Sequence, residues 1–326
     1  MSRAIEPQIM DDLARPVDIG QCKSVKVTCV SEVGWWDDNR VLAPIKAVGG
    51  LDEGDQWQAA WDLGNAAGSC TLVEVEDLEG GISRILLDAG WNNTYMAWRF
   101  QALGVDRLLS QRQVDLFMFS HEHMDHFWGL EAVLSLNPEI TLMVPSTFSL
   151  KALTLIFGGS FPNCGAINRA PHQGRLIKAH PGRVHKLMPG CAAVTFDVPI
   201  ILGVRGEQSL YFNVAGKGMV CLAGCSHQGA LALCDFAREH LAGGEKLYGL
   251  YGGLHLAPFQ TLDHQAVEVI RRLGDYGLEI MAVNHCTGKP AVEMMREVGY
   301  PVVSGGASQG SRTDLYLGNG DSVIFG

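Results

Sequence analysis

Three histidines and one aspartate lie within the segment His-Glu-His-Met-Asp-His at 121–126. The segment follows the apolar run VDLFMF and precedes a run with a helical pattern, so it is predicted at the carboxyl end of a strand, where α/β sheets bind ligands. His121 and His123 are two residues apart, so in an extended backbone they point the same way and can hold one ion. Asp125 and His126, at the start of the helix, can turn toward a second ion.

The alternative explanation of this segment is a histidine-rich turn in solvent. Four ligand-type side chains at this spacing favour a metal site over such a turn. Imidazole and carboxylate ligands suit zinc, manganese or iron(II). We therefore predict two divalent metal ions, with zinc as the first choice and manganese or iron as alternatives.

Two further histidines follow apolar strands later in the chain. His227 comes after GMVCLAG and His285 after LEIMAV, so both are predicted at strand ends. A lone histidine at a strand end is more often structural, but the shared sheet edge favours metal binding. We predict that His227 binds the ion held by His121 and His123, and that His285 binds the second ion.

Three residues are candidates for contact with a substrate. His255, in YGGLHLAPF, closes a strand, and the two glycines before it indicate a backbone that approaches a bound molecule. We predict that His255 contacts the substrate or transfers a proton, with Asp125 as the other catalytic proton-transfer group. Trp35 and Trp36 could line a pocket for a flat substrate, although core packing is the commoner fate of tryptophan.

The motif HEHMDH, together with Leu-Leu-Asp-Ala-Gly at 86–90, resembles the metallo-β-lactamase fold superfamily. This resemblance implies an α/β fold, an αββα sandwich of two mixed β-sheets with helices on the outer faces, and a binuclear metal site between the sheets. It also implies that Asp88 supports the metal-binding loop by hydrogen bonds and is not a ligand. Taken alone, Asp88 could equally be a turn residue after a strand.

Four later motifs occur in a fixed order and narrow the resemblance. They are GEQSL at 206–210, GCSHQG at 224–229, GGLHL at 252–256 and HCTG at 285–288. Such a series is similar to the branch that contains the archaeal dihydropterin and ribofuranosylaminobenzene phosphate synthases of methanopterin biosynthesis. The similarity spans about residues 70 to 310.

The chain departs from the hydrolytic members of the superfamily at two positions. Those members usually carry a ligand histidine near the position of Glu207 and a bridging aspartate near that of Cys225. Cys225 could be a thiolate ligand, because a metal deprotonates thiols, or a small buried residue, and both remain open. Glu207 could bind weakly or orient a hydrogen-bond donor, but a surface carboxylate on a hairpin is the simpler expectation.

These residues predict a binuclear metal-dependent hydrolase of a small ester, lactone or phosphorylated substrate. A hydroxide bridging the ions would be the nucleophile, the ions would polarise a carbonyl or phosphoryl oxygen, and Asp125 or His255 would transfer protons. The resemblance also implies an alternative, a pterin-type condensing enzyme in which a carbon centre displaces pyrophosphate. An iron-dependent oxidoreductase and a binding module with structural metals are further alternatives. Iron absorbance in the visible range would favour the former, and metal loss in His121→Ala without loss of turnover would favour the latter.

The elements that position these residues alternate between strands and helices. Apolar runs at 25–30, 70–75 and 82–87 predict an antiparallel meander, and from about residue 95 helices alternate with buried strands. We expect two halves that pack as two sheets with helices outside, in one domain over residues 1–326. Two segments lack a clear pattern, an excursion at 31–68 and a possible lid at 158–190. The chain is predicted to end in a hairpin that turns at Asn319-Gly320.

The composition limits the partners. Lys and Arg number 25 against 35 Asp and Glu, a net charge of −10, so an extended nucleic acid is not the expected partner. The amino terminus lacks the apolar stretch of a secretory signal, and no apolar run approaches the roughly 18 residues of a membrane span. Nine scattered cysteines without a CxxC pair indicate a reducing compartment. We expect a cytoplasmic protein with a small-molecule substrate and no membrane contact, either monomeric or oligomeric.

Overall fold

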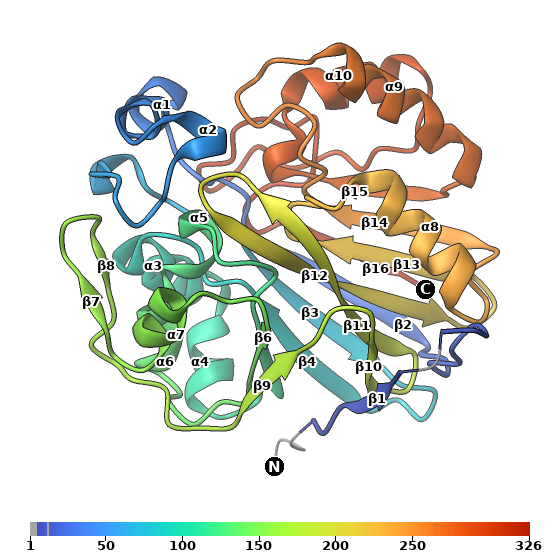
Figure 1. Ribbon diagram of the computed structural model, residues 1–326. Helices are drawn as coiled ribbons and strands as arrows, with labels where there is room; N and C mark the ends of the chain where they lie inside the picture. Colours follow the sequence, from blue (N-terminus) through green and yellow to red (C-terminus); the bar gives the residue numbers. More distant parts are fainter. Residues whose placement is uncertain (1–4, 12) are drawn as a thin grey trace.

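Two seven-stranded β-sheets pack face to face in the computed structural model, which describes residues 5–11 and 13–326 (Figure 1). The amino-terminal sheet contains, in spatial order, β16 (Ser322–Phe325), β2 (Ser24–Ser31), β3 (Cys70–Glu76), β4 (Ile82–Leu87), β5 (Leu116–Met118), β6 (Leu142–Pro145) and β9 (Leu176–Ala179). The carboxyl-terminal sheet contains β1 (Gln8–Met10), β10 (Val184–Met188), β11 (Cys191–Ile200), β12 (Val204–Val214), β13 (Gly218–Ala223), β14 (Leu247–Gly252) and β15 (Ile280–Val283). Strands β7 (Ser160–Phe161) and β8 (Ala166–Ile167) form a small separate hairpin.

Both sheets are mixed. Strands β4, β5, β6 and β9 run parallel to one another, as do β13, β14 and β15. The other neighbouring strands are antiparallel, including the predicted β2–β3–β4 meander. Each sheet therefore has one parallel half, and a parallel strand delivers its carboxyl end to the same edge as its neighbour.

Alternating side chains along the strands build separate cores on the two faces of each sheet. On β4, Ile85 and Leu87 join the core between the sheets, whereas Leu86 faces the outer helices. On β13, Val220 points inward in the same way and Cys221 points outward. Because successive side chains of a strand point to opposite faces, a strand with two buried faces is apolar at every position.

Helices cover both outer faces, so the predicted αββα sandwich is confirmed (Figure 1). Those beside the amino-terminal sheet are α3 (Asn93–Leu103), α4 (Val105–Ser110), α5 (Met124–Phe127), α6 (Leu130–Leu134) and α7 (Leu150–Ile156). Those beside the carboxyl-terminal sheet are α8 (Ala230–His240), α9 (His264–Leu273) and α10 (Lys289–Glu297), with the 3₁₀ turns η2 (Gly274–Tyr276) and η3 (His285–Thr287). No helix in the described residues is long and apolar enough to cross a membrane.

The excursion at 31–68 is more regular than its sequence indicates. It contains α1 (Asp38–Ala47), α2 (Gly50–Glu53) and the 3₁₀ turn η1 (Leu63–Asn65). Asp37 caps α1 by accepting a hydrogen bond from the Asn39 backbone N–H, and only Val41 and Ile45 of this helix are buried. Two buried positions and an internal proline give a weak periodic pattern, which explains why the sequence does not predict the helix.

The segment 158–190 is more regular than its sequence indicates, because it supplies the edge strand β9 to one sheet and β10 to the other. The two strands are short and lie on either side of Pro181 and Gly182, so their alternation is hard to detect. A lid in this segment stays a prediction. The predicted final hairpin is wrong, since β16 pairs antiparallel with β2 instead of with the residues just before it.

Candidate metal centre

The candidate residues gather where the parallel strands of the two sheets end. Asp88 follows β4, the segment 120–126 follows β5, 225–227 follows β13, His255 follows β14, and His285 follows β15. Strands β4 and β5 are parallel neighbours, as are β13, β14 and β15, so their ends share one edge in each sheet. The predicted location of the site at strand ends therefore agrees with the topology.

The backbone at these strand ends is strained. Asp88, Ser226, His255 and His285 have φ values of 63°, 58°, 50° and 51°, which makes them four of the nine non-glycine residues with positive φ in the described chain. A side chain bearing a Cβ rarely adopts this conformation, and surrounding contacts must hold it there. Such strain is often found at functional sites.

His121, His123 and His227 form the first ligand group, in which one donor atom from each lies within 4.8 Å of the others. The His121 Nε2 and His123 Nδ1 atoms are 3.0 Å apart, close to the edge of about 3.3 Å that a zinc tetrahedron with Zn–N bonds of about 2.0–2.1 Å would give. The outer nitrogens are occupied, because His121 Nδ1 contacts Ser120 Oγ at 2.8 Å and His123 Nε2 contacts the Ile201 carbonyl at 3.0 Å. The buried His227 Nε2 has no hydrogen-bond partner in the described chain. These donors fit a cation.

Asp125, His126 and His285 form the second ligand group. His126 Nε2 and His285 Nε2 are 3.1 Å apart, and Asp125 Oδ2 lies 3.4 Å from His285 Nε2 and 3.8 Å from His126 Nε2. The outer nitrogen of His285 contacts the Glu32 carbonyl at 2.8 Å. Facing nitrogens with fixed outer partners are the usual arrangement of metal-binding histidines.

Asp88 lies outside both ligand groups and supports them. Its Oδ1 accepts from the Ser120 backbone N–H at 2.7 Å, and its Oδ2 lies 2.8 Å from Ser120 Oγ and 2.7 Å from His126 Nδ1. This carboxylate therefore fixes the start of the 121–126 segment and the orientation of the His126 ring. The contacts match the supporting role that the resemblance implies.

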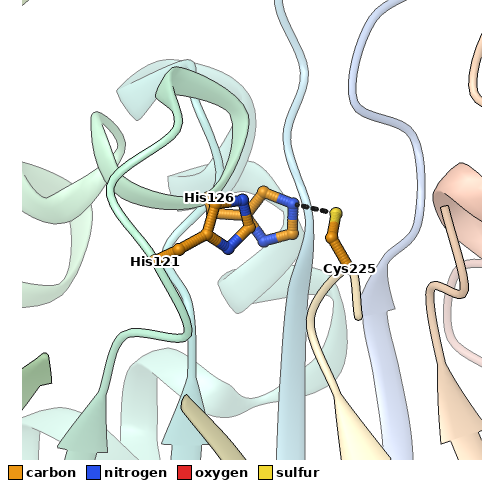
Figure 2. A group of neighbouring side chains, drawn as sticks. All are labelled: His121, His126 and Cys225. Carbon is orange, nitrogen blue, oxygen red and sulfur yellow. Dashed lines mark hydrogen bonds between the residues drawn. The ribbon is translucent and has the colours of Figure 1, made fainter. Parts of the chain in front are cut away.

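Cys225 lies between the two ligand groups. Its Sγ is 3.1 Å from His126 Nε2, and Figure 2 shows the His126 ring directed at this sulfur with His121 beside it. His121, His126 and Cys225 are themselves close enough to share a metal ion. Cys225 was expected to be either a thiolate ligand or a small buried residue. Its sulfur lies at the site, which is compatible with a ligand.

The expectation of a surface carboxylate at Glu207 is wrong. Glu207 is fully buried in β12, and its carboxylate accepts hydrogen bonds from the backbone N–H groups of Cys225, Ser226 and His227 at 2.9, 2.8 and 2.6 Å. It does not belong to a ligand group. Instead it fixes the loop that carries Cys225 and His227, which explains why a buried charge is retained there.

A narrow cavity opens beside the ligand groups. Its lining includes Asp125, His255 and Trp35, together with apolar residues of α1 and α2, and none of its lining residues comes from 158–190. Trp35 stacks on Phe259 with ring centroids 5.5 Å apart. Trp36 lies outside this cavity; it is 46% exposed, contacts Tyr95 edge-on with ring centroids 5.8 Å apart and lines a separate surface cavity.

The two ligand groups differ in charge. Burial lowers the pKa of His121 and His227 well below the usual value and that of His123 to about 4, so these rings are neutral at pH 7. Burial also acts to lower the pKa of His285, but the Cys286 and Asp125 charges outweigh it and raise this pKa to about 9. Burial would raise the pKa of Asp125, yet the neighbouring histidines hold it below its usual range.

We predict that zinc releases protons at the second ligand group and not at the first. At pH 7 the metal-free His285 is protonated and must lose its proton to bind a cation, whereas the first-group rings are already neutral. Burial acts to lower the pKa of His126, but Asp125 and Asp88 outweigh it and raise this pKa too, so affinity at the second group should rise at least about tenfold per pH unit below about pH 9. Calorimetric titration in buffers of different ionisation enthalpy measures the release, and equal release at both steps would contradict the prediction.

Gly34 leaves room for the second ligand group. A Cβ at this position would lie 2.8 Å from Asp125 Oδ2 and 3.1 Å from His285 Cε1. We predict that Gly34→Ala weakens the binding of one zinc ion by about 10- to 100-fold, as displacement of ligand-orienting groups does elsewhere. Gly64→Ala, in the exposed turn η1, is the control, and competition with a chromophoric chelator measures both; unchanged affinity in Gly34→Ala would refute this.

Three residues of the site were not predicted. Ser120 directly precedes the histidine motif, and its position alone was a usable signal. Cys286 occurs in the HCTG motif, and its Sγ is 3.2 Å from that of Cys225, a proximity that only the fold reveals. Glu32 contacts His285 through its backbone carbonyl, so its side-chain type carries no signal.

Comparison with solved structures identifies the fold as that of the metallo-β-lactamase superfamily. Tm1679, described as a metal-dependent hydrolase of the β-lactamase superfamily, superposes with a TM-score of 0.51 at 16% identity, over 92% of this chain and 98% of that one. Zn²⁺-bound PqqB from Methylobacterium extorquens superposes with a TM-score of 0.50 at 13% identity, over 92% and 99% of the two chains. At these identities the likeness defines the fold alone.

Sequence comparison finds one named relative of note. The 7,8-dihydropterin-6-methyl-4-(β-D-ribofuranosyl)-aminobenzene-5'-phosphate synthase of Methanocaldococcus jannaschii is 26% identical over 257 residues, which cover 69% of this chain and 82% of the relative. No family model matches the chain. The similarity agrees with the branch that the later motifs resemble.

Proposed function

We propose that this protein is a binuclear metal-dependent hydrolase of a small ester, lactone or phosphorylated compound, with zinc as the metal. The observation that carries the proposal is the pair of adjacent ligand groups, each with three donor atoms, beside one cavity. The donors are imidazole nitrogens and a carboxylate oxygen, which suit zinc. Tm1679, with the same fold, is described as a metal-dependent hydrolase.

The bound ions would supply Lewis acidity and an activated water, and the protein residues would do the rest. Asp125 lies in the second ligand group and lines the cavity, so its carboxylate could hold a proton taken from that water. His255 lines the same cavity, and its buried Nδ1 has no hydrogen-bond partner in the described chain. His255 is therefore placed to contact the leaving group or return a proton to it.

The walls of the cavity favour a carbonyl substrate over a phosphorylated one. Apolar side chains from four separate segments line it, including Trp35, Ile201 and Phe259. The lining residues in the described chain include no lysine or arginine, so a phosphate group would find no cationic side chain there. Within the proposed class, a compact ester or lactone with an apolar acyl group fits best.

Zinc-loaded protein should be tested on a panel of lactone, ester, thioester, phosphodiester and phosphonate substrates. We expect hydrolysis of at least one carbonyl substrate, its loss on chelation and its recovery with zinc. Asp125→Asn should abolish this activity, whereas Asp275→Asn, at an exposed position in η2, should retain it. Full metal occupancy with no activity on any substrate would defeat the hydrolase proposal.

A condensing enzyme is the second candidate. It is favoured by the similarity to the Methanocaldococcus jannaschii synthase, and by the presence of Glu207 and Cys225 where hydrolytic members of the superfamily usually carry histidine and aspartate. In this reaction the aminobenzene compound would form a bond to a carbon centre of the dihydropterin as the C–O bond to pyrophosphate breaks, so that pyrophosphate leaves. The metal-loaded protein would then release pyrophosphate only when a dihydropterin pyrophosphate and a ribofuranosylaminobenzene phosphate are both present. Release from that pair, with no hydrolysis in the panel, would decide for this candidate.

A further inference from the structure

A second kind of donor cluster lies against the candidate metal centre. Cys225, His255 and Cys286 place two sulfur atoms and one ring nitrogen within 4.8 Å of one another. The two sulfur atoms are 3.2 Å apart. His255 and Cys286 belong to neither the first nor the second ligand group, so the cluster, here termed the thiol group, is not part of the proposed binuclear centre.

The thiol group is built on rigid backbone. Cys286 is 4% exposed in η3, where Gly253 packs on it so closely that a Cβ at 253 would lie 2.5 Å from Cys286 Sγ. Cys225 is 3% exposed, and Glu207 holds its backbone N–H. The buried Nδ1 of His255 has no hydrogen-bond partner in the described chain. Two sulfur atoms and a histidine with an unsatisfied ring nitrogen thus lie close together.

The donor types define the ligand. Two sulfurs with one imidazole select soft or borderline cations, such as zinc, cadmium or copper(I), over magnesium or manganese. Zn–S bonds of about 2.3 Å give a tetrahedral S–S edge of about 3.8 Å, so the observed pair needs only to open slightly. All three residues line the cavity, which leaves a fourth coordination position open to it.

We propose that Cys225, His255 and Cys286 form a third metal subsite, which binds a soft divalent cation as a zinc or cadmium dithiolate. Because Cys225 Sγ also lies 3.1 Å from His126 Nε2, the thiolate can bridge this subsite and the neighbouring centre. An ion in the subsite takes the lone pair of His255 and so removes this residue from proton transfer. The third ion is therefore inhibitory, a consequence that depends on the proposed hydrolase function, whereas the subsite itself does not.

Cadmium titration under an added phosphine reductant tests the subsite without any activity assay. We expect one ion fewer per chain in Cys286→Ser than in the wild type, together with a weaker thiolate-to-cadmium absorption band in the ultraviolet. Cys234→Ser, a buried cysteine of α8 away from the cavity, is the matched control and should keep both values. His255→Gln retains both thiols and should also lose one ion.

Equal cadmium stoichiometry in the wild type, Cys286→Ser and His255→Gln would overturn the subsite. Thermal unfolding of each variant identifies any that fail to fold, and His255→Gln decides the question if Cys286→Ser is one of them. Failure of the hydrolase proposal can be distinguished from failure of the subsite. If only the hydrolase proposal fails, the protein is inactive, but the wild type still binds one cadmium ion more per chain than Cys286→Ser.

Discussion

His285→Ala is expected to remove one zinc ion per chain and to lower the rate of hydrolysis by more than about 100-fold. Loss of a partner that only orients a ligand already lowers metal affinity or activity by about 10- to 100-fold, and loss of the ligand itself should cost more. His227→Ala should have the same size of effect but empty the other position. The reason is that His285 belongs only to the second ligand group and His227 only to the first. Each substitution thus leaves three donors intact at the remaining ion.

Metal analysis and cobalt spectroscopy distinguish the two variants. Cobalt bound to the first group has three imidazole ligands, whereas cobalt bound to the second has two imidazoles and one carboxylate, so the variants should lose different parts of the wild-type spectrum. His264→Ala, at an exposed position in α9, is the control. Unchanged metal content in either ligand variant would contradict the assignment of the two groups.

Glu207→Ala should lower the free energy of unfolding by about 3–5 kcal/mol, the second of the two largest effects we expect. Three backbone N–H groups, two of them in buried hydrogen bonds, lose their acceptor at once, and hydrogen bonds to a charged group contribute about 1.5–3 kcal/mol each without being fully additive. Glu207→Gln keeps one acceptor oxygen and the volume of the side chain. It should therefore cost less, about 1–3 kcal/mol.

Denaturant unfolding measures the change in unfolding free energy for Glu207→Ala and Glu207→Gln. The metal-free protein is used because bound metal would itself stabilise the folded state. Glu207→Ala should also weaken zinc binding, because the same hydrogen bonds hold His227 in place. Glu245→Ala, an exposed carboxylate, should leave the unfolding free energy within about 0.5 kcal/mol of the wild type. An equally small effect of Glu207→Ala would show that the loop holds its shape without the carboxylate.

The sequence predicts the fold and the position of the site because both depend on local patterns. Apolar runs followed by histidines place His121, His227 and His285 at strand ends, and the topology then brings those ends together. The spacing of His121 and His123 is a property of extended backbone. Such information is contained within a few neighbouring residues and does not require knowledge of the packing.

The role of Glu207 could not be predicted because its partners are distant in the sequence. GEQSL is polar enough for an exposed strand, yet β12 lies inside the sheet between β11 and β13. The carboxylate is compensated by N–H groups 18 to 20 residues further along the chain. Gln208 is buried for a similar reason, since its side chain donates to the Phe119 carbonyl of the opposite sheet.

The pairing of Cys286 with Cys225 is likewise a product of topology. Sixty-one residues separate the two, and only the parallel order of β13, β14 and β15 brings their loops into contact. The helix α1 could not be predicted for a different reason. Its signal would be contained in neighbouring residues, but too few of its positions are buried to give a periodic pattern. Long-range compensation and sparse burial are the two limits on this kind of prediction.

We expect two cations to occupy the adjacent ligand groups. Anomalous diffraction at the zinc absorption edge, from crystals grown with two zinc equivalents per chain, tests it most directly. We expect one peak among His121, His123 and His227 and another among Asp125, His126 and His285. A single peak, or zinc bound only away from these residues, would contradict it.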